Sequence, residues 1–466
     1  MSALWTSGEA EAATLGRATR AFAAQGVSID TRTLKPGDLF VALKGDARDG
    51  HGFVQEAIAR GAAGALVANV PQAVPENAPL LMVADTMRGI EDLGRWARKR
   101  ARGHVVAVTG SAGKTTTKEM LRLAFGALGA THSSAASYNN HWGVPLSLAQ
   151  FPQACAFGVF EIGMNHFGEI RALAGFVRPQ VALVTIIAAA HLEYFGNVEA
   201  IADAKSEIFE RLPPDGAALV PADSDLVLRL IARARQSGVE RILSFGENAS
   251  SDARLVARTE DSHGMRVEAD VLGRVHAFRI GAAGAHMAQN AVAALLAVAV
   301  LDGDVAQAAE ALASFSALKG RGARYALPLA GGSIQIIDES YNANPASMRA
   351  ALAILGSTNP RGRRIAVLGD MLELGRDSPS LHAALADSVE QARADLVFAC
   401  GRDMRALFEA LPESRRGAWG ETSSAVAPKI VGALRAGDEV LIKGSLGSRM
   451  AVILEALRVG GGVGQS

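Results

Sequence analysis

Short apolar runs recur along the chain, and most of them lead through a polar or glycine-containing turn into a stretch of helical periodicity. Runs of this kind are typical of strands that are buried in a parallel sheet. We predict such strands at residues 64–67, 105–108, 156–161, 181–187, 333–337, 365–368, 396–399 and 439–442. Because these strands alternate with helices, the pattern predicts an α/β protein.

The pattern changes along the chain and predicts three domains, since a single core rarely serves 466 residues. Residues 1–86 predict a small α/β domain with a helix at about 53–60. Residues 87–322 begin with a basic helix at 88–102 and predict a P-loop ATPase-type domain built on a parallel sheet. Residues 323–466 alternate strands and helices regularly, which predicts a Rossmann-like, doubly wound domain.

Composition narrows the class of protein. Hydrophobic residues make up 49% of the chain, and 47 basic residues balance 47 acidic ones, so nothing favours nucleic acid or a membrane surface as a partner. The first residues lack the apolar core of a signal peptide, and the longest apolar runs are too short for a membrane span. The two cysteines, Cys155 and Cys400, are interpreted as core residues in a reducing compartment. We therefore expect a cytoplasmic, monomeric enzyme without membrane insertion.

A phosphate-binding loop follows the strand at 105–108. The sequence Thr-Gly-Ser-Ala-Gly-Lys-Thr-Thr leads into a helix whose apolar positions, such as Leu121 and Phe125, share one face. Backbone N–H groups and the helix N-terminus would face a phosphate, the lysine would reach its terminal oxygens, and the first threonine would hold Mg²⁺. The loop is a shortened form, because Val108 occupies the position where the general pattern has glycine. The predicted ATP-binding residues are Thr109, Gly110, Ser111, Ala112, Gly113, Lys114, Thr115 and Thr116.

Two polar residues follow buried strands downstream of this loop. Glu161 ends the strand at 156–161, and His191 follows the strand at 181–187. Because the carboxyl ends of parallel strands open at one edge of the sheet, we predict that both residues help to hold Mg²⁺ beside the phosphates.

Lys205 lies on the apolar face of a helix predicted at 198–212, whereas Asp203, Glu207 and Glu210 are predicted to point the other way. Burial would lower the pKa of the lysine towards a neutral amine, which can react with CO₂ to give a metal-binding carbamate. A lysine that extends its charged end to solvent is the simpler interpretation from the residues alone.

Two further groups could contact a nucleotide. His286 and Asn290 share one face at the start of an alanine-rich helix, where they could pack against adenine or simply cap the helix. Arg321, at the junction with the third segment, is placed to reach phosphate across a cleft.

Polar loops predict further binding surfaces. In the first segment, Thr31, Arg32, Lys44 and His51 could surround a diphosphate or a base, although ordinary turn chemistry explains them equally well. Asn139 and Asn140 form a loop suited to an uncharged polar ligand, or an ordinary turn. In the third segment, loops at 338–345, 369–375 and 443–445 follow strand ends and predict one binding surface, which a loop at 401–403 can join. The candidate residues there are Asp338, Tyr341, Asn342, Asn344 and Lys443.

Taken together, these motifs resemble the Mur ligase family over nearly the whole chain. The similarity covers the first-segment signature at 28–51, the short P-loop, and the motifs at 338–345 and 369–375. The resemblance implies that the first domain binds a UDP-linked substrate and that Glu161, His191 and carbamylated Lys205 hold Mg²⁺. It also implies that His286 and Asn290 contact adenine. Ile186 and Met287 depart from the family pattern, which often has asparagine at both positions.

The motifs at 338–345 and 369–375 resemble those of the family member that adds D-alanyl-D-alanine. The resemblance therefore implies ATP-dependent ligation of D-alanyl-D-alanine to UDP-N-acetylmuramoyl-tripeptide through an acyl phosphate, in cytoplasmic peptidoglycan precursor synthesis. Lys114, Glu161, His191 and Lys205 would be the catalytic residues, and the third domain would bind the dipeptide. The alternatives are another Mur-type amino-acid ligase, a ligase like folylpolyglutamate synthase, and, from a different class, a regulatory P-loop ATPase.

Overall fold

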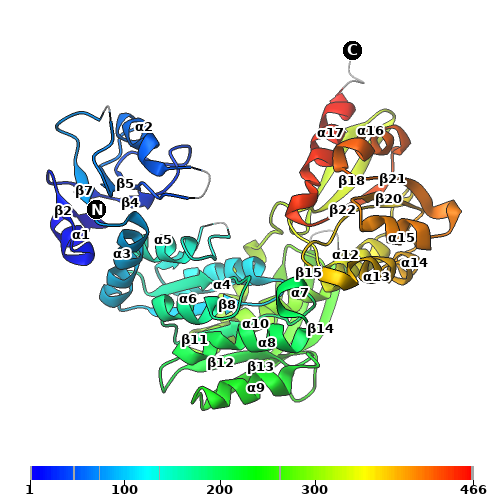
Figure 1. Cartoon of the computed structure of the whole chain (residues 1–466). Coiled ribbons are helices and arrows are strands. Elements are labelled where there is room, and N and C mark those ends of the chain that lie inside the picture. The colour runs from blue at the N-terminus through cyan, green and yellow to red at the C-terminus, as the bar shows by residue number, and fades with distance from the viewer. Residues whose placement is uncertain (1–2, 46–47, 73, 136, 262–263, 463–466) are drawn as a thin grey trace.

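The computed structural model describes residues 3–45, 48–72, 74–135, 137–261 and 264–462. Figure 1 shows three lobes, of which the first (blue) and the third (yellow to red) stand apart on either side of the central one (cyan to green). Each lobe is built on a sheet of its own. The predicted three-domain α/β fold is therefore confirmed, while the domain boundaries at 86 and 322 stay predictions. Within the described residues, no helix combines the length and apolar content needed to cross a membrane.

The first domain has a five-stranded sheet in the order β2-β7-β6-β5-β4, parallel except for β2, and a separate β1–β3 pair. Its strands are β1 Trp5–Thr6, β2 Arg17–Ala18, β3 Ala23–Ala24, β4 Gly26–Ser28, β5 Asp38–Val41, β6 Gly64–Val67 and β7 Leu80–Met82. Its helices are α1 Ser7–Thr14, the 3₁₀ turn η1 Gly50–Phe53 and α2 Val54–Ala59.

The long helix α3, Thr86–Arg100, joins the first domain to the central one. Its residues Ile90 and Leu93 pack in one cluster with residues of the first domain and with Leu146 and Ala149 of the central domain. Trp5 Nε1 donates a hydrogen bond to the Ala149 carbonyl oxygen at 2.8 Å. The first and central domains therefore share a hydrophobic core, to which α3 contributes.

The central sheet has nine strands in the order β16-β15-β14-β13-β12-β11-β8-β10-β9, of which the last seven are parallel. Its strands are β8 His104–Thr109, β9 Thr131–Ser133, β10 Phe157–Glu161, β11 Val181–Val184, β12 Ala217–Pro221, β13 Arg241–Gly246, β14 Ala253–Asp261, β15 Gly264–Val271 and β16 Arg274–Ile280. Its helices are α4 Lys114–Leu128, α5 Gly143–Ala149, α6 Glu169–Val177, α7 Leu192–Phe195, α8 Val198–Ser206, α9 Val227–Gln236, α10 Ala285–Val300 and α11 Val305–Ala311, with 3₁₀ turns η2 Glu207–Arg211 and η3 Leu312–Ser314.

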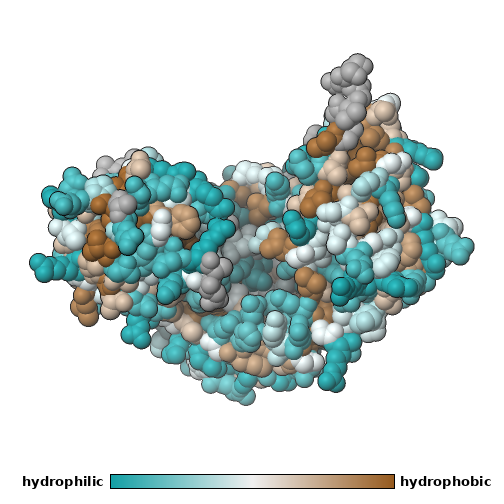
Figure 2. Space-filling model, turned by 45° about the horizontal axis from the view of Figure 1, so that its top comes forward, coloured by the Kyte–Doolittle hydropathy of each residue, from teal (hydrophilic) through white to brown (hydrophobic). Residues whose placement is uncertain are grey.

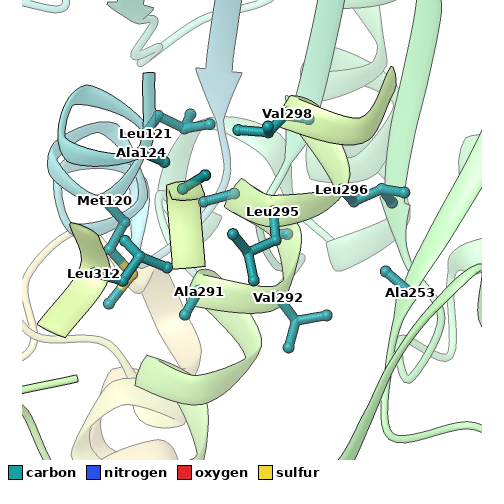
Figure 3. Close-up of a cluster of buried hydrophobic side chains, with 14 of the residues drawn as sticks. Met120, Leu121, Ala124, Ala253, Ala291, Val292, Leu295, Leu296, Val298 and Leu312 are labelled. Atoms are coloured by element: carbon teal, nitrogen blue, oxygen red, sulfur yellow. The ribbon is translucent and has the colours of Figure 1, made fainter. Parts of the chain in front are cut away.

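Helices cover both faces of this sheet because successive strand residues point to opposite sides. Val106 and Val108 of β8 pack with α4 and α10, whereas Val105 and Ala107 pack with α5, α6 and α8. Figure 3 shows the first of these clusters, with Leu295 of α10 among the side chains that face α4. The P-loop strand is thus held between two cores.

The third domain has a six-stranded sheet in the order β17-β18-β22-β19-β20-β21, parallel except for β17. Its strands are β17 Ala323–Leu329, β18 Gly332–Glu339, β19 Arg364–Gly369, β20 Leu396–Cys400, β21 Arg416–Gly420 and β22 Glu439–Lys443. Its helices are α12 Pro345–Ser357, α13 Ser378–Ala383, α14 Ala386–Gln391, α15 Met404–Ala410, α16 Ser423–Ala433 and α17 Ala451–Gly462, with 3₁₀ turns η4 Gly375–Asp377, η5 Glu413–Arg415 and η6 Leu446–Ser448. Helices α12, α14 and α15 pack on one face and α16 and α17 on the other, which confirms the doubly wound fold.

Two predicted elements end early. The strand predicted at 181–187 stops at Val184, because the backbone beyond it leaves the sheet to bond to the P-loop. The helix predicted at 198–212 becomes a 3₁₀ turn after Ser206. Leu212 is extended, as expected for a residue that precedes proline.

Glu207, which was predicted to point away from the apolar face of this helix, is buried against α6. Its side chain is buried and accepts hydrogen bonds from the backbone N–H groups of Gly168 at 2.8 Å and Arg171 at 3.0 Å, at the start of α6. The carboxylate therefore satisfies free N–H groups at a helix N-terminus instead of pointing into solvent.

Cys400 is buried as expected, whereas Cys155 is partly exposed.

We expect Leu295→Ala to destabilise the central domain by about 2–5 kcal/mol, because the fully buried side chain would leave a cavity. The exposed Leu228 on α9 is the matched control, and its change to alanine should stay within about 0.5 kcal/mol. Urea unfolding followed by circular dichroism would measure both variants. Equal midpoints for the two variants would contradict the assignment of α10 to the core.

Candidate functional site

The loop between β8 and α4 depends on two glycines. Gly110 has a φ of 151°, and a Cβ atom there would lie 1.9 Å from Thr185 Oγ1. Gly113 has a φ of 80° and immediately precedes α4. Other residues would be strained at both positions. Because α4 starts directly after this loop, its free N–H groups form an anion-binding site of the kind that the sequence predicts.

A segment that follows β11 holds this loop in place. The Ser111 N–H donates to the Ile186 carbonyl oxygen at 2.8 Å, and Ser111 Oγ donates to the Ala188 carbonyl oxygen at 2.9 Å. Thr185 Oγ1 donates to the Ala112 carbonyl oxygen at 2.5 Å. Thr185 was not singled out from the sequence, because it was predicted to lie inside the strand at 181–187, whereas β11 ends at Val184. Ile186 takes part through its backbone, so this contact does not depend on its side chain.

Lys114 folds back over the loop. Its Nζ donates to the Gly110 carbonyl oxygen at 2.8 Å. Burial lowers the pKa of this ammonium, the nearby Glu161 carboxylate raises it, and Arg321 lowers it further. A bound phosphate would give Lys114 an anionic partner in place of the neutral carbonyl group.

Glu161 and Thr115 come together as predicted. Glu161 is 1% exposed, and its Oε2 accepts a hydrogen bond from Thr115 Oγ1 at 2.8 Å. Its Oε1 accepts one from Asn139 Nδ2 at 2.7 Å. Asn139 therefore holds the carboxylate in this structure, whereas the exposed Asn140 caps a turn by accepting from the Gly143 N–H at 2.9 Å.

His191 is paired across a domain boundary. Its Nδ1 lies 2.5 Å from Oε2 of Glu373, in the third-domain loop at 369–375. The hydrogen bond from His191 is the largest cause that lowers the pKa of Glu373. Glu373 was not singled out from the sequence, because only the docking of the two domains reveals its partner.

Lys205 is buried more deeply than a solvent-reaching lysine could be. It is 1% exposed, which excludes the interpretation that its charged end extends to solvent. Burial, with a smaller contribution from the charge of Lys114, lowers its pKa well below the usual value. Among the described residues, no hydrogen bond or ion pair is recorded for its ammonium group. Such a site favours a neutral amine.

Asn290 and His286 lie at the start of α10. Asn290 is buried against the P-loop, where a Cβ atom at Gly113 would lie 3.1 Å from its Oδ1. Its Nδ2 has no hydrogen-bond partner in the described part of the chain, so it is a free donor for a ligand. Burial lowers the pKa of His286 and favours the neutral ring. Met287 packs in the hydrophobic core and replaces any polar contact there.

Arg321 connects the third domain to the P-loop. Its guanidinium group lies 3.8 Å from the centre of the Tyr341 ring, and its Nη2 donates to Ser137 Oγ at 3.0 Å. Ser137 Oγ in turn lies 3.3 Å from Thr115 Oγ1. Asn344 Nδ2 also reaches the Ser111 carbonyl oxygen at 3.3 Å. The motif at 338–345 therefore touches the phosphate-binding loop.

Two predicted binding residues of the third domain are buried. Asp338 accepts hydrogen bonds from the Gly320 N–H at 3.1 Å and from Ser340 Oγ at 2.6 Å, so it shapes the turn. Lys443 Nζ lies 3.3 Å from Glu339 Oε2 and donates to the carbonyl oxygen of the exposed Asn342 at 2.9 Å. In this structure both side chains are buried, and their hydrogen bonds hold the backbone of these loops in place.

A cavity of about 240 Å³ opens at the carboxyl ends of β19, β20 and β21. This is the edge at which a doubly wound sheet binds ligands. The cavity is lined by the loop at 369–375 and by Gly401, which the sequence predicted to lie on one surface. It is also lined by residues that were not singled out from the sequence. The lining residues are Asp370, Leu372, Cys400, Gly401, Glu421, Thr422, Ser423, Ser424, Gly447, Ser448 and Arg449. Burial raises the pKa of Asp370.

The four candidates of the first domain make mostly local contacts. Arg32 pairs with Asp30 at 2.6 Å and its side chain is 80% exposed. His51 Nε2 accepts from the Ala68 N–H at 2.9 Å, while Thr31 is buried and Lys44 is exposed. No recorded contact joins these four side chains within the described residues. Figure 2 shows this domain facing the third one across a hollow.

The described residues include no group of three His, Cys, Asp or Glu side chains that could enclose a metal ion. Mg²⁺ rarely needs such a cage, because it binds through one or two carboxylates together with phosphate oxygens and water. The donor set of Thr115 and Glu161, next to an anion-binding loop, fits this ion.

Comparisons with known proteins cover all three domains. Three family models match: Mur ligase family, catalytic domain, at residues 23–99; Mur ligase middle domain at 108–298; and Mur ligase, glutamate ligase domain, at 323–446. A UDP-N-acetylmuramoyl-tripeptide–D-alanyl-D-alanine ligase of Escherichia coli is 36% identical over 93% of this chain and 94% of its own length.

Two solved structures are similar over almost their whole length. MurF from Acinetobacter baumannii has a TM-score of 0.83 and 30% identity, with 98% of this chain and 99% of that chain covered. MurF ligase from Thermotoga maritima in complex with ADP has a TM-score of 0.75 and 25% identity, with 94% and 98% covered. These similarities extend over all three domains, and this chain belongs to the Mur ligase family.

Proposed function

We propose that this protein joins D-alanyl-D-alanine to UDP-N-acetylmuramoyl-tripeptide and converts ATP to ADP and phosphate, as a cytoplasmic step of peptidoglycan precursor synthesis. The observation that carries the proposal is the contact of the motif at 338–345 with the P-loop, in which Asn344 Nδ2 donates to the Ser111 carbonyl oxygen. An acceptor held by the third domain would meet a phosphate there. The name of the Escherichia coli relative, a D-alanyl-D-alanine ligase, supports the same substrates.

Each domain binds one of the three substrates. Residues 1–86 bind the UDP end of the peptide substrate. The candidate contact residues there are Thr31, Arg32, Lys44 and His51. Residues 87–322 bind ATP, and residues 323–466 bind the dipeptide. Arg32 lies near Tyr138, from the loop that carries Asn139, which supports this division. The substrate would run from the first domain along this loop to the P-loop.

ATP is held mainly by the loop at 109–116. The backbone of this loop and the N-terminus of α4 bind the phosphates, and Lys114 exchanges the Gly110 carbonyl group for the terminal phosphate. The free amide of Asn290 and the neutral ring of His286 contact the nucleotide from α10. Arg321, at the junction with the third domain, offsets phosphate charge.

Mg²⁺ would be held by Thr115 and Glu161 and, at a second position, by His191 and carbamylated Lys205. When it is bound, Mg²⁺ offsets the negative charge of the phosphoryl oxygens and orients them. Asn139 keeps the Glu161 carboxylate in place by donating a hydrogen bond to Oε1. The other oxygen, Oε2, could then exchange its hydrogen bond with Thr115 for a bond to Mg²⁺.

The chemistry proceeds in two displacements. The terminal carboxylate of the tripeptide attacks the γ-phosphorus atom, an O–P bond forms, and the bond to the leaving ADP breaks. The amine of the dipeptide then attacks the acyl carbon, an amide bond forms, phosphate leaves and the amine loses a proton. Domain closure around the site excludes water, which would otherwise hydrolyse the acyl phosphate.

The cavity at the end of β19 suits the dipeptide. The Asp370 carboxylate can accept hydrogen bonds from the incoming ammonium group, and the exposed Arg449 can bind the terminal carboxylate. The apolar side chain of Leu372 supplies a surface for the methyl groups.

Lys205 is the proposed site of a carbamate. The neutral amine favoured by burial attacks CO₂, a C–N bond forms and one proton is released, so the buried neutral amine becomes a metal-binding anion. The charge of Lys114, which disfavours a cation at Lys205, would attract this anion.

We expect the wild-type protein to release phosphate from ATP only when UDP-N-acetylmuramoyl-tripeptide and D-alanyl-D-alanine are both present. Single amino acids and glutamate should replace the dipeptide poorly, and a colorimetric phosphate assay over this panel tests the point. Lys114→Ala should lower the rate on the order of a hundredfold or more, because the charge on the transferred phosphoryl group loses its cation. Equal rates without any acceptor amine would refute ligation and favour a regulatory ATPase.

We expect Lys205→Ala to be inactive and to regain part of its activity when a small carboxylate such as formate is added, because formate can take the place of the carbamate. Wild-type protein in ¹³C-bicarbonate should give a carbamate signal in the ¹³C NMR spectrum that Lys205→Ala lacks. Lys99→Ala, on an exposed position of α3, serves as the control and should behave as wild type. A missing signal together with absent rescue would rule the carbamate out.

A further inference from the structure

His191 and Glu373 form the shortest polar link between the central and third domains among those described above. The distance from His191 Nδ1 to Glu373 Oε2 is 2.5 Å, although 182 residues separate the two along the chain. His191 lies in the loop that follows β11, and Glu373 lies in the loop that follows β19. A side chain from each domain therefore meets at the edge where the phosphates of ATP would bind.

Both backbones are held in an unusual conformation at this contact. The φ angles are 60° for His191 and 63° for Glu373, in the left-handed region that residues other than glycine rarely adopt. Such conformations persist only where the surroundings enforce them, and they concentrate at functional sites. The two loops are thus shaped to bring these two side chains together.

Backbone contacts surround the pair. The Glu193 N–H donates to the Glu373 carbonyl oxygen at 3.1 Å, and a Cβ atom at Gly375 would lie 3.3 Å from the Glu193 Cα atom. Leu192 packs against hydrophobic clusters of both domains. The short helix α7 is therefore docked on the loop at 369–375, and the pair is part of a built interface.

The chemistry of an imidazole ring gives this contact a consequence. When one ring nitrogen is hydrogen-bonded to a carboxylate, the tautomer and the orientation of the ring are fixed, and the other nitrogen becomes a more basic ligand. In His191 the bonded atom is Nδ1, which leaves Nε2 as the ligand.

We propose that Glu373 is a positioning residue that holds His191 by Nδ1, so that Nε2 is presented to a divalent cation when the third domain is docked. This inference rests on the proposed function, which makes His191 a metal ligand. It adds that the third domain, besides binding the dipeptide, completes the metal site of the central domain.

The test measures metal binding directly, with Mn²⁺ as the probe. Mn²⁺ is titrated by electron paramagnetic resonance into full-length protein that carries a non-hydrolysable ATP analogue. Removing a partner that orients a ligand typically weakens metal binding about 10–100-fold, so Glu373→Ala should weaken the second Mn²⁺ site by that factor. Glu373→Gln should weaken Mn²⁺ binding less, because the amide oxygen of glutamine can still accept a hydrogen bond from His191 Nδ1. Glu193→Ala removes a neighbouring carboxylate without removing the hydrogen bond, and should bind Mn²⁺ as wild type does.

A double-mutant cycle separates positioning from a merely structural role. Once His191 is changed to alanine, the further change Glu373→Ala should have no effect on Mn²⁺ affinity, because the group that it positions is gone. An undiminished effect in the His191→Ala background would overturn the proposal. So would unaltered Mn²⁺ affinity in Glu373→Ala, or a wild-type complex that binds a single Mn²⁺ ion. These titrations contain no acceptor amine, so their failure is distinct from a failure of the phosphate-release assay.

Discussion

The site depends on the position of β8 between β10 and β11 in one parallel sheet. Because the carboxyl ends of the three strands lie side by side, the P-loop, Glu161 and the segment that begins at Thr185 meet at one edge. The hydrogen bonds of Thr115 to Glu161 and of Thr185 to the loop follow from this order. Both faces of the sheet are buried under helices, and this edge is left open for a ligand.

The two interfaces of the central domain differ in kind. The first domain shares a hydrophobic cluster with it, in which α3 contributes to both sides. The third domain meets it through a few polar contacts, made by Asn344 and Glu373 and by the Tyr341 ring against Arg321, and through the small apolar contact of Leu192. Small, polar interfaces of this type permit relative motion of domains, whereas a shared core opposes it.

Local patterns were enough to predict the strand, loop and helix around Lys114, and the meeting of Thr115 with Glu161, because strand order places neighbouring strand ends together. They were not enough for Glu373 or Asn139, whose partners are set by tertiary packing. Helical periodicity placed Glu207 opposite the apolar face, but it could not foresee that the helix tightens into a 3₁₀ turn and that this carboxylate is buried against α6. The burial of Lys205 excludes a side chain that reaches solvent, whereas its carbamylation stays a prediction.

The shared core around α3 has a consequence for the length of the substrate. Since the first domain is packed against the P-loop domain through this cluster, the packing sets the distance from the proposed UDP-binding surface to the phosphate loop. A peptide that is bound at its nucleotide end must then have the right length to reach the phosphate loop. A chain one residue too short would leave its carboxylate outside the reach of the γ-phosphate, whatever its affinity for the first domain.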